Sequence, residues 1–264
     1  QLITQTIVAS FGEQISVKSP NLETNKLTGV SKSQNKRTCY QTCNLEENVF
    51  LHNSSSFANK SYSSSPTWIC YNEICETNFS RNMYMRNAIE IKSPSILANL
   101  CPNHCTFSKP IYDELDETSL PYYDSKSDKI FCNVTATYGP QSWKIPGKIE
   151  IEFPNQEYGL DKFRWFGRFL LEGKVYRQFT EIQAYLKLKP SFIVKIWAAD
   201  QKIVQGLVNF LANYEICSKK QLAKLEYKLK RNFVYLLGQF YTENDQDLVV
   251  EKLVKIFGVD DEEN

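Results

Sequence analysis

The sequence predicts a mainly β, disulfide-stapled sandwich over residues 1–154, an α+β domain with C-terminal helices over residues 155–258, and an acidic tail over residues 259–264. Three observations support this fold class. Cysteines crowd into the first half of the chain, short β-favouring runs alternate there with polar loops, and the hydrophobic period becomes helical after residue 200. With 264 residues, of which 42% are hydrophobic, the chain is long enough for two domains.

The β-favouring runs of the first half are short. Residues 4–11, 14–18 and 129–139 are rich in β-branched and aromatic side chains, which favours strands. In residues 147–154 apolar and charged side chains alternate strictly, which is typical of a half-buried strand. This last strand is expected to close the first domain.

The second half is predicted to contain two strands and then three helices. Residues 180–190 and 191–197 are expected to be strands. The three helices are expected to begin near Asp200, Ser218 and Asn244, and Gly258 stands where a helix commonly ends. The aromatic cluster of Phe163, Trp165, Phe166 and Phe169 is expected to pack in the core.

The eight cysteines are the strongest chemical signal of the sequence. All eight are predicted to form disulfides: Cys39, Cys43, Cys70, Cys75, Cys101, Cys105, Cys132 and Cys217. Seven of them lie in the first half, so Cys217 either pairs back to that half or leaves one thiol for another chain. The connectivity stays open, because eight cysteines allow about 105 complete pairings.

The chain begins at Gln1, which we interpret as the start of a mature, secreted protein. Four Asn-x-Ser/Thr sequons agree with that interpretation and are candidate glycosylation sites: Asn53, Asn59, Asn78 and Asn133. The net charge of +1 gives no long-range field, so neither a nucleic-acid partner nor direct membrane insertion is expected.

Two other interpretations of the cysteines are weaker. A zinc site is possible on paper, because His104 stands between Cys101 and Cys105, but the gaps between paired cysteines differ from the usual two residues. A thiol nucleophile would need a base, and only His52 and His104 are available. No phosphate-binding loop or dinucleotide fingerprint occurs. We therefore expect no metal, no cofactor and no catalytic residue.

One family shares the order of motifs in residues 97–153. The Cys-Pro-x-x-Cys segment at Cys101, the strand that carries Cys132 and the closing strand at 147–153 resemble the C-terminal part of the 6-cysteine (s48/45) domain of apicomplexan surface proteins. An LCCL domain is the nearest alternative. The resemblance implies a disulfide-pinned β-sandwich that acts in adhesion. The sequence departs from the family pattern at Val134, where a second cysteine is usual.

The resemblance also implies a function. It would make the chain a secreted, non-enzymatic subunit of a malaria-parasite erythrocyte-invasion complex on the merozoite surface. Protein partners would hold it there, above all a disulfide-linked, membrane-anchored thrombospondin-repeat adhesin. Two alternatives stay open. One is a secreted hydrolase that uses His104 or His52, and the other is a structural subunit of the mitochondrial intermembrane space, where Cys-x3-Cys pairs are also oxidised.

Overall fold

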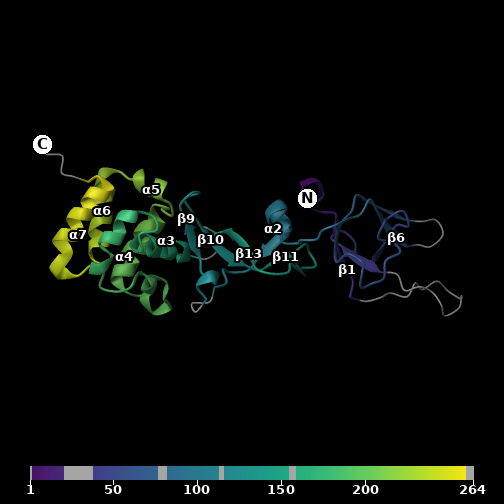
Figure 1. The fold of residues 1–264 in the computed structure, drawn as a ribbon, viewed down its shortest axis with the longest axis horizontal. Coiled ribbons are helices and arrows are strands. Elements are labelled where there is room, and N and C mark those ends of the chain that lie inside the picture. The colour runs from purple at the N-terminus through teal and green to yellow at the C-terminus, as the bar shows by residue number, and fades with distance from the viewer. Residues whose placement is uncertain (1, 21–37, 77–81, 113–115, 155–158, 260–264) are drawn as a thin grey trace. The chain divides into compact units, whose positions relative to one another are not determined.

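A computed structural model describes residues 2–20, 38–76, 82–112, 116–154 and 159–259. The chain forms two compact units that are interleaved in sequence (Figure 1). The N-terminal unit comprises residues 1–108 and 134–149, and the C-terminal unit comprises residues 109–133 and 150–264. The domain boundaries expected at residues 154 and 258 stay a proposal.

The N-terminal unit is built on a seven-stranded sheet with the order β5-β6-β3-β2-β1-β4-β7. Its strands are β1 (Ile15–Lys18), β2 (Cys39–Thr42), β3 (Val49–Leu51), β4 (Trp68–Cys70), β5 (Glu73–Glu76), β6 (Met83–Arg86) and β7 (Ile89–Glu90). Neighbouring strands are antiparallel except β3 and β6, which run parallel. One side of the sheet buries an apolar core of Tyr40, Val49, Leu51, Ile69, Tyr71 and Met85. The strand expected at residues 14–18 is confirmed.

A second, three-stranded sheet completes this unit. It consists of β8 (Cys105–Phe107), β11 (Ala136–Tyr138) and β12 (Trp143–Lys144), with β11 in the centre. Two side chains join it to the larger sheet: Trp143 Nε1 donates to Gln41 Oε1 at 3.2 Å, and Gln141 Nε2 donates to the Thr42 carbonyl at 3.0 Å. Trp68 packs edge-on against Trp143. The two sheets therefore share one aromatic core.

The first element is a helix, so the strand predicted for residues 4–11 is wrong. Helix α1 (Leu2–Ser10) buries Val8 completely and contacts α2 (Ile96–Leu100). The hydroxyls of Thr6 and Ser10 donate to backbone carbonyls four residues earlier, which satisfies them within the helix. Packing against α2 thus overrides the β propensity of this run.

The C-terminal unit contains a small sheet with the order β13-β10-β9, formed by β9 (Tyr122–Asp124), β10 (Lys129–Val134) and β13 (Ile149–Glu152). The strand expected at residues 147–154 is confirmed, whereas the run expected at residues 129–139 divides into β10 of this sheet and β11 of the three-stranded sheet of the N-terminal unit. Helix α3 (Asp161–Leu171) packs on β9, where the ring of Tyr123 lies 6.4 Å from Phe166 and 6.5 Å from Phe169. The core position expected for Trp165, Phe166 and Phe169 is confirmed, because each is at most 1% exposed.

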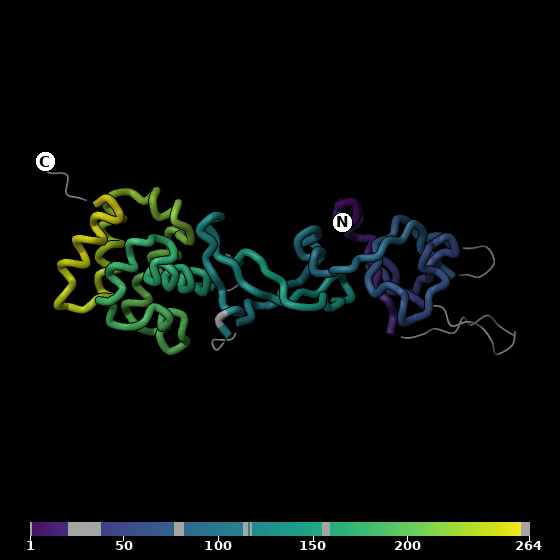
Figure 2. Tube along the Cα trace, viewed as in Figure 1, coloured from purple at the N-terminus to yellow at the C-terminus, as the bar shows by residue number. Residues whose placement is uncertain are grey.

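Helices form the rest of this unit. They are α4 (Lys202–Asn213), α5 (Lys219–Ala223), α6 (Tyr227–Gly238) and α7 (Gln246–Phe257), and α6 contacts both α4 and α7 (Figure 2). The caps expected at Ser218 and Gly258 are confirmed: the Ser218 hydroxyl accepts from the Gln221 amide, and Gly258 is left-handed. The second predicted helix is in fact two, α5 and α6, which are separated before Glu226.

The two strands predicted between residues 180 and 197 are wrong. The chain forms short 3-10 turns there: η3 (Arg177–Glu181), η4 (Gln183–Tyr185), η5 (Pro190–Val194) and η6 (Ile196–Ala198). The alternation that predicted strands does not correspond to one buried face, since Leu188 is 45% exposed and Ile196 is 90% exposed. Pro190, which has no amide hydrogen to donate, instead opens η5.

All eight cysteines are free thiols. Four of them, Cys39, Cys70, Cys101 and Cys132, are at most 5% exposed and pack as small apolar side chains. The disulfide-stapled sandwich is therefore wrong: hydrophobic packing, not covalent bridging, holds the described sheets together. In the described part of the chain no helix is both long and apolar enough to cross a membrane.

Candidate functional site in the N-terminal unit

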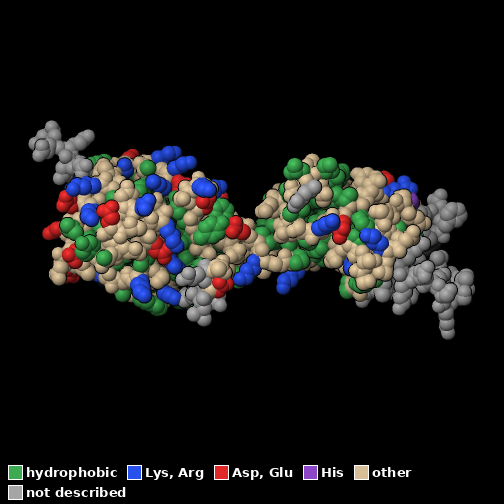
Figure 3. All heavy atoms as spheres, viewed as in Figure 1, with side chains coloured by type: hydrophobic (Ala, Val, Ile, Leu, Met, Phe, Trp, Pro, Cys, Tyr) green, Lys and Arg blue, Asp and Glu red, His purple; other side chains and the backbone are tan. Residues whose placement is uncertain are grey.

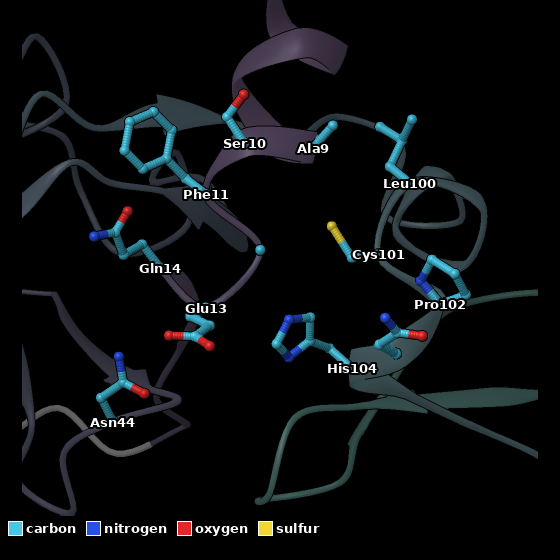
Figure 4. A pocket seen from close by; sticks show the side chains of 12 residues that line it. Ala9, Ser10, Phe11, Glu13, Gln14, Asn44, Leu100, Cys101, Pro102 and His104 are labelled. Atoms are coloured by element: carbon cyan, nitrogen blue, oxygen red, sulfur yellow. The ribbon is translucent and has the colours of Figure 1, made fainter.

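A hollow of about 540 Å³ opens beside the seven-stranded sheet of the N-terminal unit. Three pieces of chain form it: the end of α1 with the turn into β1, the end of α2 with the 3-10 turn η1 (Pro102–His104), and Asn44 after β2. Figure 4 shows Glu13 and Asn44 on one side and Cys101 and His104 on the other. The lining residues are Ala9, Ser10, Phe11, Gly12, Glu13, Gln14, Asn44, Leu100, Cys101, Pro102, Asn103 and His104.

Gly12 lets the two helical segments approach each other. A Cβ atom at this position would lie 3.0 Å from Cys101 Sγ and 3.2 Å from His104 Cδ2, which is tighter than ordinary contact. The carbonyl of Gly12 accepts a 2.6 Å hydrogen bond from the buried Tyr138 hydroxyl. Residue 12 is therefore fixed in place from both sides, and a side chain there would narrow the hollow.

The three-stranded sheet positions His104. Strand β8 begins directly after this residue and pairs with β11, and the Gly139 amide donates to the His104 carbonyl at 2.9 Å. The imidazole lies 6.0 Å from the ring of Tyr138, measured between ring centroids, with the planes tilted by 35°. The imidazole thus lies near an aromatic ring and also lines the hollow.

Cys101 is not an activated thiol. Its sulfur donates to the Val8 carbonyl at 3.5 Å, and burial raises the pKa of the thiol. Burial likewise raises the pKa of Cys105 to about 11. Because a thiolate is the form that attacks substrates, these raised pKa values argue against nucleophilic chemistry at this site.

The rim of the hollow is polar. Glu13 supplies a carboxylate, Asn44 and Asn103 supply amides, and His104 supplies an imidazole. Gln14 Oε1 is buried and accepts no hydrogen bond within the described residues. An unsatisfied buried acceptor costs roughly 1–3 kcal/mol, so a bound group that donates a hydrogen bond there would be favoured. The arrangement is suited to binding a polar, hydrogen-bonding ligand.

The structure separates the residues that the sequence suggested for chemistry. Cys101, His104 and Cys105 lie at or beside the hollow. His52 lies elsewhere, after β3, where its Nδ1 is 2.8 Å from the Ser54 hydroxyl and its ring is edge-on to Tyr84. Among the described residues no group of three histidine, cysteine or acidic side chains could hold a metal ion.

Cys217 lies in the C-terminal unit and is a free thiol. It forms a hydrogen bond with the side chain of the buried Lys162, and burial raises the pKa of its thiol. The charge of Lys162 also acts on Cys132, whose pKa is raised to about 12 by burial. Glycosylation of the sequons stays a prediction, and Asn78 lies outside the described residues.

Glu13, Gln14 and Asn44 are among the residues of the hollow that the sequence did not indicate. No motif contains them, and Asn44 is thirty positions from Gln14. They come together only because β1 pairs with β2, which brings the turn before one strand close to the turn after the other.

Part of the N-terminal unit is similar to a known family of domains. Residues 3–104 match a family described as oligonucleotide/oligosaccharide-binding (OB)-fold. The match includes α1, the seven-stranded sheet and η1, and every residue that lines the hollow lies inside it. The N-terminal unit is therefore similar to an OB fold.

Several curated proteins that are similar to the chain carry names of RNA helicases. The chain is 31% identical over 205 residues to the human "Probable ATP-dependent RNA helicase DHX37", a match of 77% of this chain and 16% of that protein. It is 28% identical over 227 residues to "Probable ATP-dependent RNA helicase kurz" of Drosophila melanogaster, covering 84% and 17%. For "ATP-dependent RNA helicase DEAH13" of Arabidopsis thaliana the identity is 31% over 187 residues, covering 71% and 14%.

The chain thus spans about a sixth of the length of the curated relatives it matches. A solved structure of the Escherichia coli DExH-box NTPase HrpB also matches, over 94% of this chain and 26% of that chain. Its sequence identity is 11% and its TM-score is 0.29, and we base no argument on it.

These comparisons overturn the functional predictions made from the sequence. The resemblance to 6-cysteine surface proteins is wrong, since the relatives are ATP-dependent RNA helicases and the matched family is the OB fold. The expectation of a secreted, non-enzymatic invasion subunit at the cell surface fails on the same finding, because those relatives are enzymes and not adhesins. The exclusion of nucleic-acid partners fails as well, since the family description and the relatives' names both refer to nucleic acids.

Proposed function

We propose that this chain is the accessory, RNA-binding part of an ATP-dependent RNA helicase, and that its N-terminal unit holds one nucleotide of a single strand in the hollow beside β1. The observation that carries the proposal is the OB-fold match over residues 3–104, which encloses the whole hollow. The relatives' names supply the enzyme class and the nucleic acid.

The chemistry of the hollow supports a nucleotide as its ligand. Amide side chains such as those of Asn44, Asn103 and Gln14 pair with the hydrogen-bonding edges of bases, and a ribose hydroxyl can both donate and accept. Gln14 Oε1 offers a buried acceptor for a base amine or a 2′-hydroxyl. Proteins recognise RNA sequence mostly in single strands, where base edges are exposed.

The net charge of the protein does not attract a single-stranded RNA. Acidic and basic side chains are interspersed on the visible face of the molecule (Figure 3), and the net charge is +1. Binding at the hollow should therefore depend on hydrogen bonds more than on counterion release, so that its affinity changes little with salt.

Fluorescence anisotropy tests the proposal with the 264-residue chain and fluorescein-labelled twelve-nucleotide single strands of each RNA base. Asn44→Asp places a negative charge at the rim of the hollow and should weaken binding about 5-fold, because phosphate and carboxylate repel. Asn72→Asp makes the same change at an exposed position of the same unit that does not line the hollow, and should leave affinity unchanged. Equal effects of the two substitutions, or no binding of any strand, would reject the hollow as the RNA site.

A further inference from the structure

The C-terminal unit carries two adjoining hollows that the proposed RNA binding does not use. One has a volume of about 230 Å³ and the other of about 520 Å³, and both are lined by Arg168 and Ser191. They lie between α3 and η5, which pack closely against each other. From their charge and shape we propose that the two hollows bind an acidic protein segment that inserts one apolar side chain.

The guanidinium of Arg168 is oriented to bind an anion. Its Nε donates to Glu172 Oε1 at 2.6 Å, and its Cζ lies 4.9 Å over the ring of Trp165. The side chain is only 16% exposed, and its two terminal nitrogens donate no hydrogen bond within the described residues. A guanidinium that is oriented on one side by a carboxylate and an indole presents its remaining edge to a carboxylate ligand at little entropic cost.

The charges around the shared lining are unbalanced. Three cationic side chains line the larger hollow, Arg168, Lys174 and Lys189, against one carboxylate, that of Glu172. Lys174 already contacts this carboxylate at 2.7 Å. Lys189 is exposed and forms no ion pair with the described residues. An acidic ligand would therefore balance a net charge of about +2 in the lining of the larger hollow.

The smaller hollow is shaped for an apolar side chain. Tyr112, Leu120, Trp165 and Val194 line it, with the ring of Tyr112 edge-on to Trp165 at 5.3 Å. Trp165 is 1% exposed and one face of its ring is covered by Arg168, so it offers no open face on which a nucleobase could stack. A hollow of this volume beside cations fits one Leu- or Phe-sized anchor of a peptide better than a base.

Exposed apolar residues follow directly in the chain. Lys195 lines the smaller hollow, and the next two residues, Ile196 and Trp197, are 90% and 59% exposed. Trp197 is kept in position by stacking on Phe192, 6.3 Å between ring centroids. Tryptophan is enriched at the energetic centres of protein interfaces. This favours a protein ligand over RNA.

A peptide array probes the site with the full 264-residue chain. Each twelve-residue peptide carries one central Leu, Phe or Trp and three to five Asp or Glu at varied positions, and is paired with a peptide that has Asn and Gln instead. Bound peptides are then measured in solution by fluorescence anisotropy. Lys189→Glu is the test variant, and Lys228→Glu on the exposed face of α6 is its matched control. Circular dichroism shows that both variants are folded.

We expect acidic peptides to bind at least 10-fold more tightly than their neutral partners, and replacement of the anchor by Ala to weaken binding by a similar factor. Lys189→Glu should reduce affinity about 10-fold, while Lys228→Glu leaves it unchanged. The proposal would be overturned if no acidic peptide bound at 1 mM, or if Lys189→Glu and Lys228→Glu bound the peptide with equal affinity. It would also be overturned if oligouridine displaced the bound peptide and Lys189→Glu lost RNA binding, because the site would then bind RNA. Asn44→Asp should not affect the peptide, which separates this site from the proposed RNA site.

Discussion

Asp128 is the residue whose replacement tests the packing of the C-terminal unit most directly. It lies between β9 and β10 and has a left-handed backbone, with φ of 58°. Its carboxylate accepts from the Lys219 amide at 2.6 Å and from the Lys220 amide at 2.9 Å, at the beginning of α5. The Tyr123 hydroxyl donates to the same carboxylate. One side chain therefore joins the hairpin, the sheet and a helix more than ninety residues away.

The expected loss in the free energy of unfolding can be estimated from these contacts. A hydrogen bond to a charged acceptor contributes on the order of 1.5–3 kcal/mol, and we take the low end because the two amides are exposed, which gives about 3 kcal/mol for both. Asp128→Gly loses them and also the hydrogen bond from the Tyr123 hydroxyl, but it keeps the left-handed backbone and should cost at least about 3 kcal/mol. Asp128→Ala adds roughly 1 kcal/mol of backbone strain. Asp128→Asn tolerates the backbone and keeps one acceptor, and should cost about 1–2 kcal/mol.

Urea unfolding followed by circular dichroism at 222 nm measures these differences, because the long helices α3, α4, α6 and α7 lie in the C-terminal unit. Hydrogen exchange of the Lys219 and Lys220 amides supplies a local measurement and should accelerate in all three variants. The reasoning would be refuted if Asp128→Ala were no less stable than Asp128→Asn, or if exchange at these two amides did not change.

Three further predictions concern packing, thiol chemistry and a buried charge. Gly12→Ala should lower the free energy of unfolding by about 1–3 kcal/mol, because the new Cβ would clash with Cys101 Sγ. Thermal unfolding measures this loss, and an unchanged melting temperature would show that α1 and α2 can move apart without cost. The thiols whose pKa burial raises to about 11 or 12 are Cys43, Cys70, Cys105 and Cys132. In the unfolded chain these thiols ionise near pH 8.5–9, so the native state binds more protons above that pH, and stability should fall between about pH 9 and pH 12. Urea titrations at pH 8, 9 and 10 measure this fall in stability. Alkylation of the native thiols at pH 8 should be slow, whereas the chain denatured without reductant should take up eight alkyl labels. A native disulfide would reduce that number by two. Glu152→Gln should cost about 1–3 kcal/mol, because it removes the negative charge that lies 3.7 Å from the ammonium of the buried Lys162, whereas Lys162→Met should cost less. The reverse order in urea unfolding would contradict this account.

Local patterns predicted the C-terminal elements better than the N-terminal fold. The alternation around Ile149 and the glycine after Phe257 each describe one element whose boundaries depend on nearby residues, and both predictions were confirmed. The segment 191–197 has a similar apolar pattern but Pro190 and the packing of η5 on α3 determine its conformation. Residues 4–11 likewise became a helix because α2, almost ninety residues away, buries Val8.

The cysteines show why composition misled the functional prediction. The amino-acid sequence does not distinguish a buried thiol from a half-cystine, and both are common in compact domains. Cys70 is fully buried and its pKa is raised to about 12, which marks a packed apolar side chain, yet no neighbouring residue in the sequence indicates this. The candidate site could be predicted only in part: His104 and Cys101 stand in a recognisable segment, whereas Gln14 and Asn44 come together only through the pairing of β1 with β2.

The interleaving of the two units has a consequence for how the protein can be made. Strands β9 and β10 belong to the C-terminal unit, yet they leave the ribosome before residues 134–149, which complete the other unit. Their third strand, β13, and the helices that cover them are synthesised later still. During translation the hairpin of β9 and β10 therefore has an unpaired edge until β13 is synthesised. An unpaired edge can associate with other nascent chains. A fragment cut at any single peptide bond between residues 109 and 149 would lack part of at least one unit, so the two can be separated only by redesigning the connections.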